Sequence, residues 1–500
     1  MNTSHGPLRR KPVSAVLAQN DADHVDAAHP GLAKKLTAMD LVGFGVGLVI
    51  GTGIFTLTGV QAKNAAGPAV VLSFLIAGIV ALLAALCYAE LASSVPTAGS
   101  AYTYAYTTIG ELFGWIIAWD LILEFALAAS VVARGWSGYL QSALGLPPTF
   151  FGEDSVVNLG AAGITLVLGA IAALGITETK WVTNVLVVIK VSVCLFIIGV
   201  GAFFVRVENW SPFVPPAQPA PESVGSWLTM PLWQAVTGAT PSVFGASGVV
   251  AAAAVVFFAF GGFEVLANLG EETRDPGRDM PRGLIGALTV CTALYIGVSL
   301  VVTGMVNYTQ LSEGAPLADA FDHVGLHWAG SLIGIAAVAG LTSVILVALV
   351  GLGRVGFALA RDGLLPARFG QVHPRWRTPV GVTVGATLVV ALLAAFVPLG
   401  ALAEMVSIGT LFAFFIVSIA VVVLRRTAPD MRRPFRVPFS PVVPLASAAL
   451  CLGLMSSLVV ETWLRFVVWF VVGLAIYFGY GIRHSRLAAA REGHRESTRG

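Results

Sequence analysis

The chain has 500 residues, of which 56% are hydrophobic and only 11% are charged, and its formal net charge is +2. So little polar surface excludes a water-soluble globular protein and indicates a chain that crosses a membrane many times. The small net charge gives no indication of nucleic-acid binding, because the basic residues are concentrated between the apolar runs.

Polar tails are predicted at both ends of the chain. Residues 1–36 have no apolar core, which favours a disordered cytoplasmic tail over a cleaved signal. Residues 483–500 form the second tail, and residues 37–482 form the membrane core. Twelve apolar runs in that core are long enough to cross about 30 Å of hydrocarbon. They cover residues 41–60, 69–89, 112–140, 157–176, 182–205, 247–268, 284–306, 331–360, 380–398, 401–424, 441–460 and 464–482.

The distribution of Lys and Arg predicts the orientation of these spans. With the N-terminus in the cytoplasm, 23 of the 29 basic residues fall on the cytoplasmic side and three on the opposite side. Both termini are therefore expected in the cytoplasm, and the protein is expected to be a multi-pass protein of the inner cell membrane.

The first span is expected to break in its middle. It holds Gly45, Gly47, Gly51 and Gly53, and each glycine costs a helix about 1 kcal/mol relative to Ala. Hydrocarbon cannot satisfy a broken backbone, so such a break is expected where it lines a ligand cavity. Close helix packing through Gly47 and Gly51 is the alternative.

A second glycine break is expected in the sixth span. At 1.5 Å per residue, Gly261 lies about 20 Å from the external entry of its span, and Gly51 to Gly53 lie about 20 Å from the cytoplasmic entry of theirs. Breaks at equal depth in spans of opposite direction indicate inverted repeats with a binding site between them. The repeats would cover residues 37–206 and 245–425, and residues 441–482 would form two extra spans.

Such a pair of breaks suits a zwitterionic ligand. Free N–H groups attract a carboxylate, whereas free carbonyls accept from an ammonium group. An α-amino acid carries both charges, so the breaks would hold its head group while nearby side chains select its R group. The aromatic rings of Phe258, Phe260 and Phe263 could cover the ligand, or could make ordinary lipid and core contacts.

Ionisable residues inside the predicted spans are expensive, because a charge there costs about 2.5–3.5 kcal/mol on insertion, and three of them are singled out. Asp120 and Glu124 are one turn apart, so they share a face of the third span. Lys190 lies about 12 Å from the cytoplasmic end of the fifth span. Burial disfavours a charged lysine, which suits a proton carrier; a structural ion pair with a carboxylate on another span is the alternative.

No cofactor or metal is expected. The cysteines are far apart in sequence, all lie within apolar runs, and have no metal-binding or disulfide spacing. They are Cys87, Cys194, Cys291 and Cys451. All eight histidines fall outside the predicted spans, so no histidine relay is expected within the membrane.

Six motifs, in the same order along the chain, resemble the amino acid–polyamine–organocation superfamily, in particular the bacterial relatives of the cationic amino acid transporters. They are residues 50–55, 95–102, 119–124, 270–276, 360–366 and 433–438. The resemblance implies an all-α polytopic fold with twelve transmembrane helices, arranged as five-plus-five inverted repeats and two C-terminal helices. It also implies a proton-coupled amino acid permease that works as a monomer.

The resemblance also assigns roles to single positions. The backbones of Thr52 and Gly53 would bind the substrate carboxylate. The amine would meet carbonyls at Val49, Phe258, Ala259 and Gly261, while Phe263 would be an external gate. Lys190 would replace the sodium ion of sodium-coupled relatives, and Glu124 would take part in proton coupling. Gly261 and Glu264 depart from the family pattern, which more often has Val or Ile and Asp, respectively.

Other functions remain open at this stage. A membrane-embedded enzyme or nutrient receptor could use the same cavity, although the spans hold no histidine or cysteine pair for an enzyme's chemistry. Within transport, exchange or uniport is an alternative to symport of substrate and protons. The glycine at position 261 favours a broad substrate range, namely neutral amino acids with possible cationic ones and no preference for acidic ones.

Overall fold

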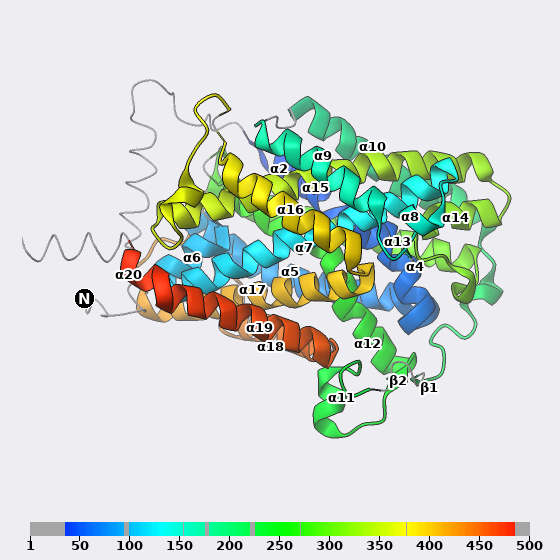
Figure 1. Ribbon diagram of the computed structural model, residues 1–500. Helices are drawn as coiled ribbons and strands as arrows, with labels where there is room; N and C mark the ends of the chain where they lie inside the picture. Colours follow the sequence, from blue (N-terminus) through cyan, green and yellow to red (C-terminus); the bar gives the residue numbers. More distant parts are fainter. Residues whose placement is uncertain are drawn as a thin grey trace, which may run out of the picture.

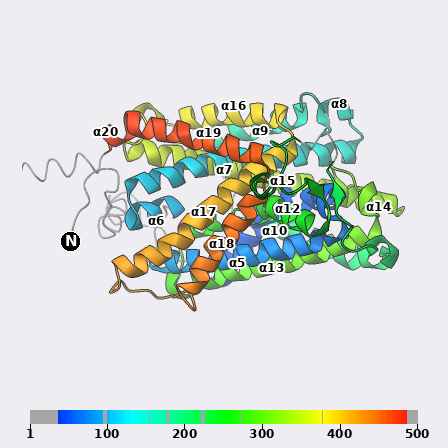
Figure 2. The ribbon, with the colours of Figure 1, turned by 90° about the horizontal axis from the view of Figure 1, so that it is seen from below.

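The computed structural model describes residues 36–485, except 95–99, 154, 176–179, 221–225, 271 and 377. Residues 1–35 and 486–500, which make up nearly all of the two predicted tails, lie outside the described part, as does most of the motif at 95–102. The described residues form an elongated bundle of helices, seen from two directions in Figures 1 and 2.

Eight described segments are long and apolar enough to cross a membrane, and four shorter apolar helices accompany them. The long ones are Leu57–Ser94, Glu111–Leu144, Val182–Phe204, Gly245–Ala267, Pro276–Met305, His327–Arg361, Leu399–Thr427 and Val460–His484. The short ones are α2 (Ala38–Val49), α9 (Leu159–Ala173), α16 (Val380–Phe396) and α18 (Val442–Ser456). Every predicted span overlaps one or two of these segments, so the sequence correctly predicted a helical, multi-pass membrane protein.

The first span is interrupted, as its glycines predict. Helix α2 begins with a capping box, in which Thr37 and Asp40 exchange side-chain and backbone hydrogen bonds, and it ends at Val49. Ile50 and Gly51 are extended, and the chain continues as α3 (Thr52–Phe55) and α4 (Leu57–Gln61). A π-turn, η1 (Ala62–Ala66), and a 3-10 turn, η2 (Gly67–Ala69), lead into α5 (Val70–Ser94).

The sixth span is interrupted too. It runs through α12 (Gly245–Val256) and the 3-10 turn η6 (Phe257–Phe260) to Gly261 and Gly262. Gly262 has a φ of 99°, a conformation that a residue with a side chain rarely adopts, so the interruption of the span needs glycine at this position. Beyond it, η7 (Phe263–Leu269) continues as a 3-10 helix of seven residues.

The long helices pack in matching pairs around the two breaks. Helix α5 contacts α13 (Pro276–Met305), and α7 (Glu111–Leu144) contacts α15 (His327–Arg361). Helix α10 (Lys180–Gly201) contacts α2, α13 and α15. The last helices, α18 and α19 (Val460–Ile476), pack on α17 (Leu399–Thr427) at the edge of the bundle, as Figure 2 shows.

Short elements cap the ends of the bundle. They are α6 (Ser100–Thr108), α8 (Pro148–Phe151), η3 (Ala202–Phe204), η4 (Val207–Trp210), α11 (Leu232–Thr237), η8 (Tyr308–Gln310), α14 (Pro316–His323), η9 (Ala367–Gly370), η10 (Tyr477–Gly481) and α20 (Ile482–His484). Strands β1 (Gln218–Pro219) and β2 (Ser242–Val243) pair antiparallel, with Gln218 opposite Val243. Helices α6 and α20 lie at the left end of the bundle in Figure 1.

That end is called the basic end below. Helices α2 and α13 begin there, since Leu36 exchanges backbone hydrogen bonds with Glu272 and Arg274 just before α13. Helices α5 and α17 end there, because Glu90 near the end of α5 binds Arg425 in the last turn of α17. Among the described residues, the arginines at the start of α13 and at the end of α17 therefore lie at one end.

A buried arginine ties the opposite end together. Arg134 of α7, only 2% exposed, donates to the carbonyls of Ala394 and Ala395 at the end of α16, at 3.0 and 3.1 Å. It also forms an ion pair of 3.0 Å with Glu153, which accepts from the backbone N–H of Leu399. Burial raises the pKa of the Glu153 carboxyl, and the nearby Arg134 guanidinium opposes that rise.

We expect Arg134→Met to destabilise the fold by roughly 3–5 kcal/mol, because it leaves a buried carboxylate and two carbonyls without their donor. Arg134→Lys should lose much of the same stability, since a single ammonium cannot reproduce the planar fork. Unfolding in detergent would measure both, with the exposed Arg206→Met as the control for loss of one charge at this end. An unchanged unfolding midpoint in Arg134→Met would contradict the role given to this arginine.

Candidate functional site

The two broken spans touch each other at their breaks. A Cβ atom added to Gly53 would lie 2.3 Å from the Cα atom of Ala259. The two backbones can therefore come this close only because residue 53 has no side chain. Thr52, Gly53 and Ala259 are all buried. The structure therefore brings the predicted residues of the first and sixth spans together, although about 200 residues separate them in sequence.

Carbonyl groups from both breaks converge on one hydroxyl group. Tyr295 of α13 donates to the carbonyl of Val49, at 2.7 Å, and lies 2.9 Å from that of Ala259. Val49 is the last residue of α2, so its carbonyl has no acceptor role within the helix. A hydroxyl has one proton, so it can fully satisfy only one of these acceptors at a time.

Sequence analysis missed Tyr295. The signal was its position in the middle of the apolar run 284–306, because a buried tyrosine hydroxyl usually has a hydrogen-bond partner. The partners themselves could not be inferred, since both are backbone groups of other spans.

Two hydroxyl groups lie unused on the other side of the first break. The side chains of Thr52 and Thr56 are completely buried, and their oxygens have no hydrogen-bond partner among the described residues. They face Gly135 of α7, where an added Cβ would lie 3.0 and 3.1 Å from the two oxygens. The first N–H groups after the break, at Thr52 and Gly53, also have no helical carbonyl before them. This side of the site consists of donors.

Carboxyl groups flank the second break. The side-chain oxygen of Glu124 accepts from Thr410 of α17 at 2.8 Å, and an added Cβ at Gly261 would lie 3.9 Å from the same oxygen. Both oxygens of Glu264 accept from the N–H of Gly262 at 3.0 Å. Asp120 is completely buried, and neither of its oxygens has a hydrogen-bond partner among the described residues.

Lys190 reaches the first break from the fifth span. Its ammonium group donates to the carbonyl of Gly47 at 2.8 Å, and its side chain is 2% exposed. An added Cβ at Gly340 would lie 3.0 Å from two of its carbons, so the lysine lies flat against α15. The carbonyl of Gly47 is available because α2 ends two residues later, and a cation there complements the negative end of the helix.

The aromatic residues of the sixth span fall on two sides of the break. Phe263 is completely buried between the rings of Tyr88 and Phe414, at 5.6 and 5.0 Å. It lies on η7, the half of the span that leads to the basic end. The external gate that the resemblance implies at Phe263 stays a prediction. Phe258 lies before the break and is 9% exposed, whereas Phe257 and Phe260 are completely buried, so Phe258 is the better candidate for an external cover.

Comparisons with known proteins agree on one kind of protein. The sequence profile of the family described as "Amino acid permease" matches residues 36–480. The chain is 43% identical over 490 residues to the methylthioribose transporter of Bacillus subtilis (strain 168), covering 96% of this chain and 99% of that one. It is 41% identical over 493 residues to the branched-chain amino acid permease BcaP of the same organism, with 96% and 98% coverage. It is 37% identical over 433 residues to the vacuolar cationic amino acid transporter 4 of Arabidopsis thaliana, with 85% and 68% coverage.

The contact between the breaks predicts unequal effects for two neighbouring glycines. Gly53→Ala should destabilise the fold by about 1–3 kcal/mol, because its Cβ meets backbone at 2.3 Å. Gly51→Ala should be much milder, since its Cβ would contact only Val344, at 3.8 Å. Thermal unfolding of the two purified variants in detergent without ligand measures the difference, and equal midpoints would show that the breaks do not touch as described.

Proposed function

The chain belongs to the amino acid permease family, and we propose that it is a secondary active transporter that carries α-amino acids into the cell together with protons. The observation that carries this proposal is the convergence of the Val49 and Ala259 carbonyls on one hydroxyl at the contact between two broken helices. The relatives are named transporters and permeases, not enzymes.

The ammonium group of the substrate would bind at the converging carbonyls. The carbonyl oxygens of Val49 and Ala259 both lie within 2.9 Å of the Tyr295 hydroxyl oxygen. An ammonium group has three N–H donors, whereas this hydroxyl has one. The carbonyl of Phe258, which already accepts from the N–H of Gly261, and the carbonyl of Gly261 would be further acceptors at the same break. The carboxylate would bind the backbone donors at Gly51, Thr52 and Gly53, helped by the unused hydroxyl of Thr52.

The substrate class is inferred from this polarity. Acceptors on one side and donors on the other match the charges of an amino acid head group. Relatives are named for branched-chain amino acids, for cationic amino acids and for methylthioribose. Methylthioribose has neither an ammonium nor a carboxylate group, so we place it second. A broad range of neutral amino acids, with cationic ones included and acidic ones not preferred, is our proposal.

Coupling to protons would operate at the first break. The charged form of Lys190 holds the carbonyl of Gly47, and loss of its proton would remove the charge that stabilises the end of α2. Glu124 is a second candidate proton carrier, because its carboxyl lies beside Gly261 and Thr410. Phe258 would close the external side of the site.

We further propose twelve crossings with both termini in the cytoplasm. Repeat one would cover residues 37–206, repeat two residues 245–425, and residues 441–482 two extra spans. The pairing of α5 with α13 and of α7 with α15 supports this, because these are the second and third helices of each repeat. The arginines gathered at the basic end support the orientation. A monomer would be the functional unit.

Uptake into proteoliposomes tests the function directly. Labelled alanine, leucine, arginine, glutamate and methylthioribose would be offered with and without an inward proton gradient, and with sodium replaced by potassium. We expect accumulation of the neutral amino acids that depends on the proton gradient and is indifferent to sodium. Uptake that only equilibrates or only exchanges would favour the uniport or exchange alternative, and exclusive uptake of methylthioribose would reject the amino acid proposal.

The position of Lys190 predicts that Lys190→Met abolishes accumulation driven by the proton gradient but leaves part of substrate binding. The reason is that the variant keeps the carbonyls of Val49 and Ala259 but removes the group whose charge changes. Gradient-driven uptake would be compared with the thermal shift caused by the same amino acid. Lys63→Met, which removes a half-exposed lysine paired with Glu313, is the control. Normal gradient dependence in Lys190→Met would refute the role of this lysine.

A further inference from the structure

A groove at the basic end lies outside the transport site. It is formed by the first three turns of α13 and by Pro434 and Phe435 of the loop between α17 and α18, and its volume is about 600 Å³. Arg278 and Arg282 line it together with the apolar side chains of Pro281 and Ile285. The groove is therefore at the level where α13 begins its membrane span.

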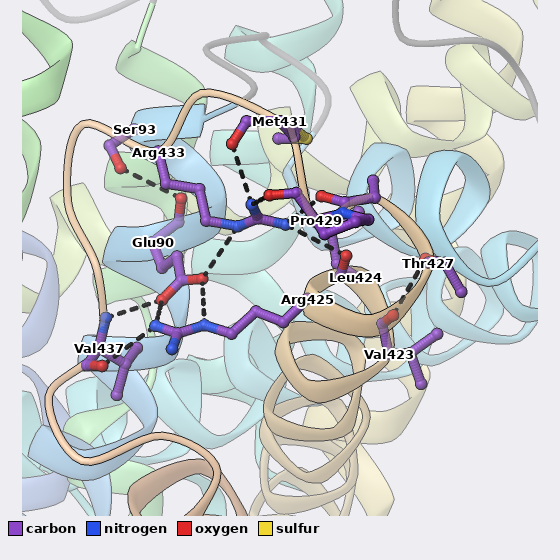
Figure 3. A network of polar contacts seen from close by, with 11 residues as sticks. Glu90, Ser93, Val423, Leu424, Arg425, Thr427, Pro429, Met431, Arg433 and Val437 are labelled. Atoms are coloured by element: carbon purple, nitrogen blue, oxygen red, sulfur yellow. Dashed lines mark hydrogen bonds and ion pairs between the residues drawn. The ribbon is translucent and has the colours of Figure 1, made fainter.

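The loop that forms one wall is held in place by a charged network. Glu90 of α5 accepts two hydrogen bonds from Arg425 and one from the backbone N–H of Val437, and Arg433 lies 3.6 Å away (Figure 3). An added Cβ at Gly277 would lie 2.6 Å from the ring of Pro434, so the loop packs directly on α13. Both walls of the groove are thus built into the fold.

The two arginines in the groove differ from those in the network. Arg425 and Arg433 both form an ion pair with Glu90. Arg278 and Arg282, one helical turn apart and both exposed, make no side-chain hydrogen bond or ion pair with any described residue. Two guanidinium groups on one helix face repel each other, and a phosphate between them would turn that repulsion into charge-assisted hydrogen bonds.

The same face of α13 becomes apolar towards the middle of the membrane. Ile285 follows the two arginines on this face, the hydroxyl of the exposed Thr289 donates to the carbonyl of Ile285, and Ala293 beyond it is also exposed. Phe435 adds an aromatic wall across the groove. A ligand with an anionic head and a hydrocarbon chain would match the whole surface, whereas a free phosphate would use only its charged part.

We propose that this groove binds one anionic phospholipid, whose phosphate lies between Arg278 and Arg282 and whose acyl chain follows Ile285 and Ala293 of α13. The occupant is distinct from the transported substrate. Gly286, at the inner edge of the groove, packs on Val42 of α2, because an added Cβ there would lie 2.8 Å from that side chain. The bound lipid would therefore be a direct neighbour of the helix that carries the first break.

Native mass spectrometry of the delipidated full-length protein, titrated with phosphatidylglycerol or phosphatidylcholine, tests the proposal. We expect one preferred phosphatidylglycerol. The double variant Arg278→Gln, Arg282→Gln should weaken its binding roughly 10- to 30-fold, since each basic residue near an anionic lipid surface contributes about fivefold. The matched control is Arg426→Gln, Arg432→Gln, which removes two exposed arginines of the same end that do not line the groove, and it should bind as the parent protein does.

Phosphatidylglycerol with a photoreactive acyl chain adds the location. Labelling should map to α13 around Ile285 and Ala293 and disappear in the groove variant. Equal weakening in both double variants would show a diffuse surface charge effect and overturn the proposal. Displacement of the lipid by millimolar glycerol 3-phosphate would assign the groove to a free anion instead. A cross-link from residues 1–35 to the groove that lipid does not displace would assign it to the chain's own tail.

Discussion

Every polar group of the backbone inside a bilayer must find its hydrogen-bond partner within the protein, because hydrocarbon offers none. This chain interrupts two helices, so backbone N–H and C=O groups at both interruptions need partners from elsewhere in the fold. Side chains of neighbouring helices provide those partners. The Tyr295 hydroxyl lies within hydrogen-bond distance of the carbonyls of Val49 and Ala259, and the Lys190 ammonium group donates to the carbonyl of Gly47. At the second break, Ser407 of α17 accepts from the N–H of Phe258 and donates to Val255, while Glu264 accepts from Gly262. The helices around the breaks must therefore carry side chains that form hydrogen bonds with the free backbone groups.

These partners divide the surroundings of the breaks into two kinds. The Tyr295 and Ser407 hydroxyls are fixed in charge, so they can only form or release hydrogen bonds. Lys190, Glu124 and Glu264 can also change charge, and each is bonded to a group at or beside a break. In the proposed function, ligand recognition and a response to protons would therefore depend on the same few contacts. This proximity is what a coupled transporter requires, because binding and protonation must each affect the same helix ends.

The sequence predicted the regular features well because they follow from local rules. Apolar length identifies a span, and clustered glycines identify a break such as that at Gly51. Contacts between distant residues were harder. Glu124 was expected to matter, but nothing in its neighbourhood indicates that it faces Gly261, and Tyr295 was missed altogether. The resemblance implies an external gate at Phe263, but the rings that enclose it, those of Tyr88 and Phe414, could not be inferred from the sequence. Tertiary partners needed the structure.

The inner half of the sixth span has an unusual geometry with a consequence for length. Seven residues of η7 form a 3-10 helix, although runs longer than three or four residues are uncommon. A 3-10 helix rises about 2.0 Å per residue and an α-helix about 1.5 Å. Rewinding η7 as an α-helix would therefore shorten it by about 3.5 Å without moving α12. The distance between the second break and α13 therefore depends on how η7 is wound. The α-helical form would bring the two ends of this segment closer, and the 3-10 form keeps them farther apart.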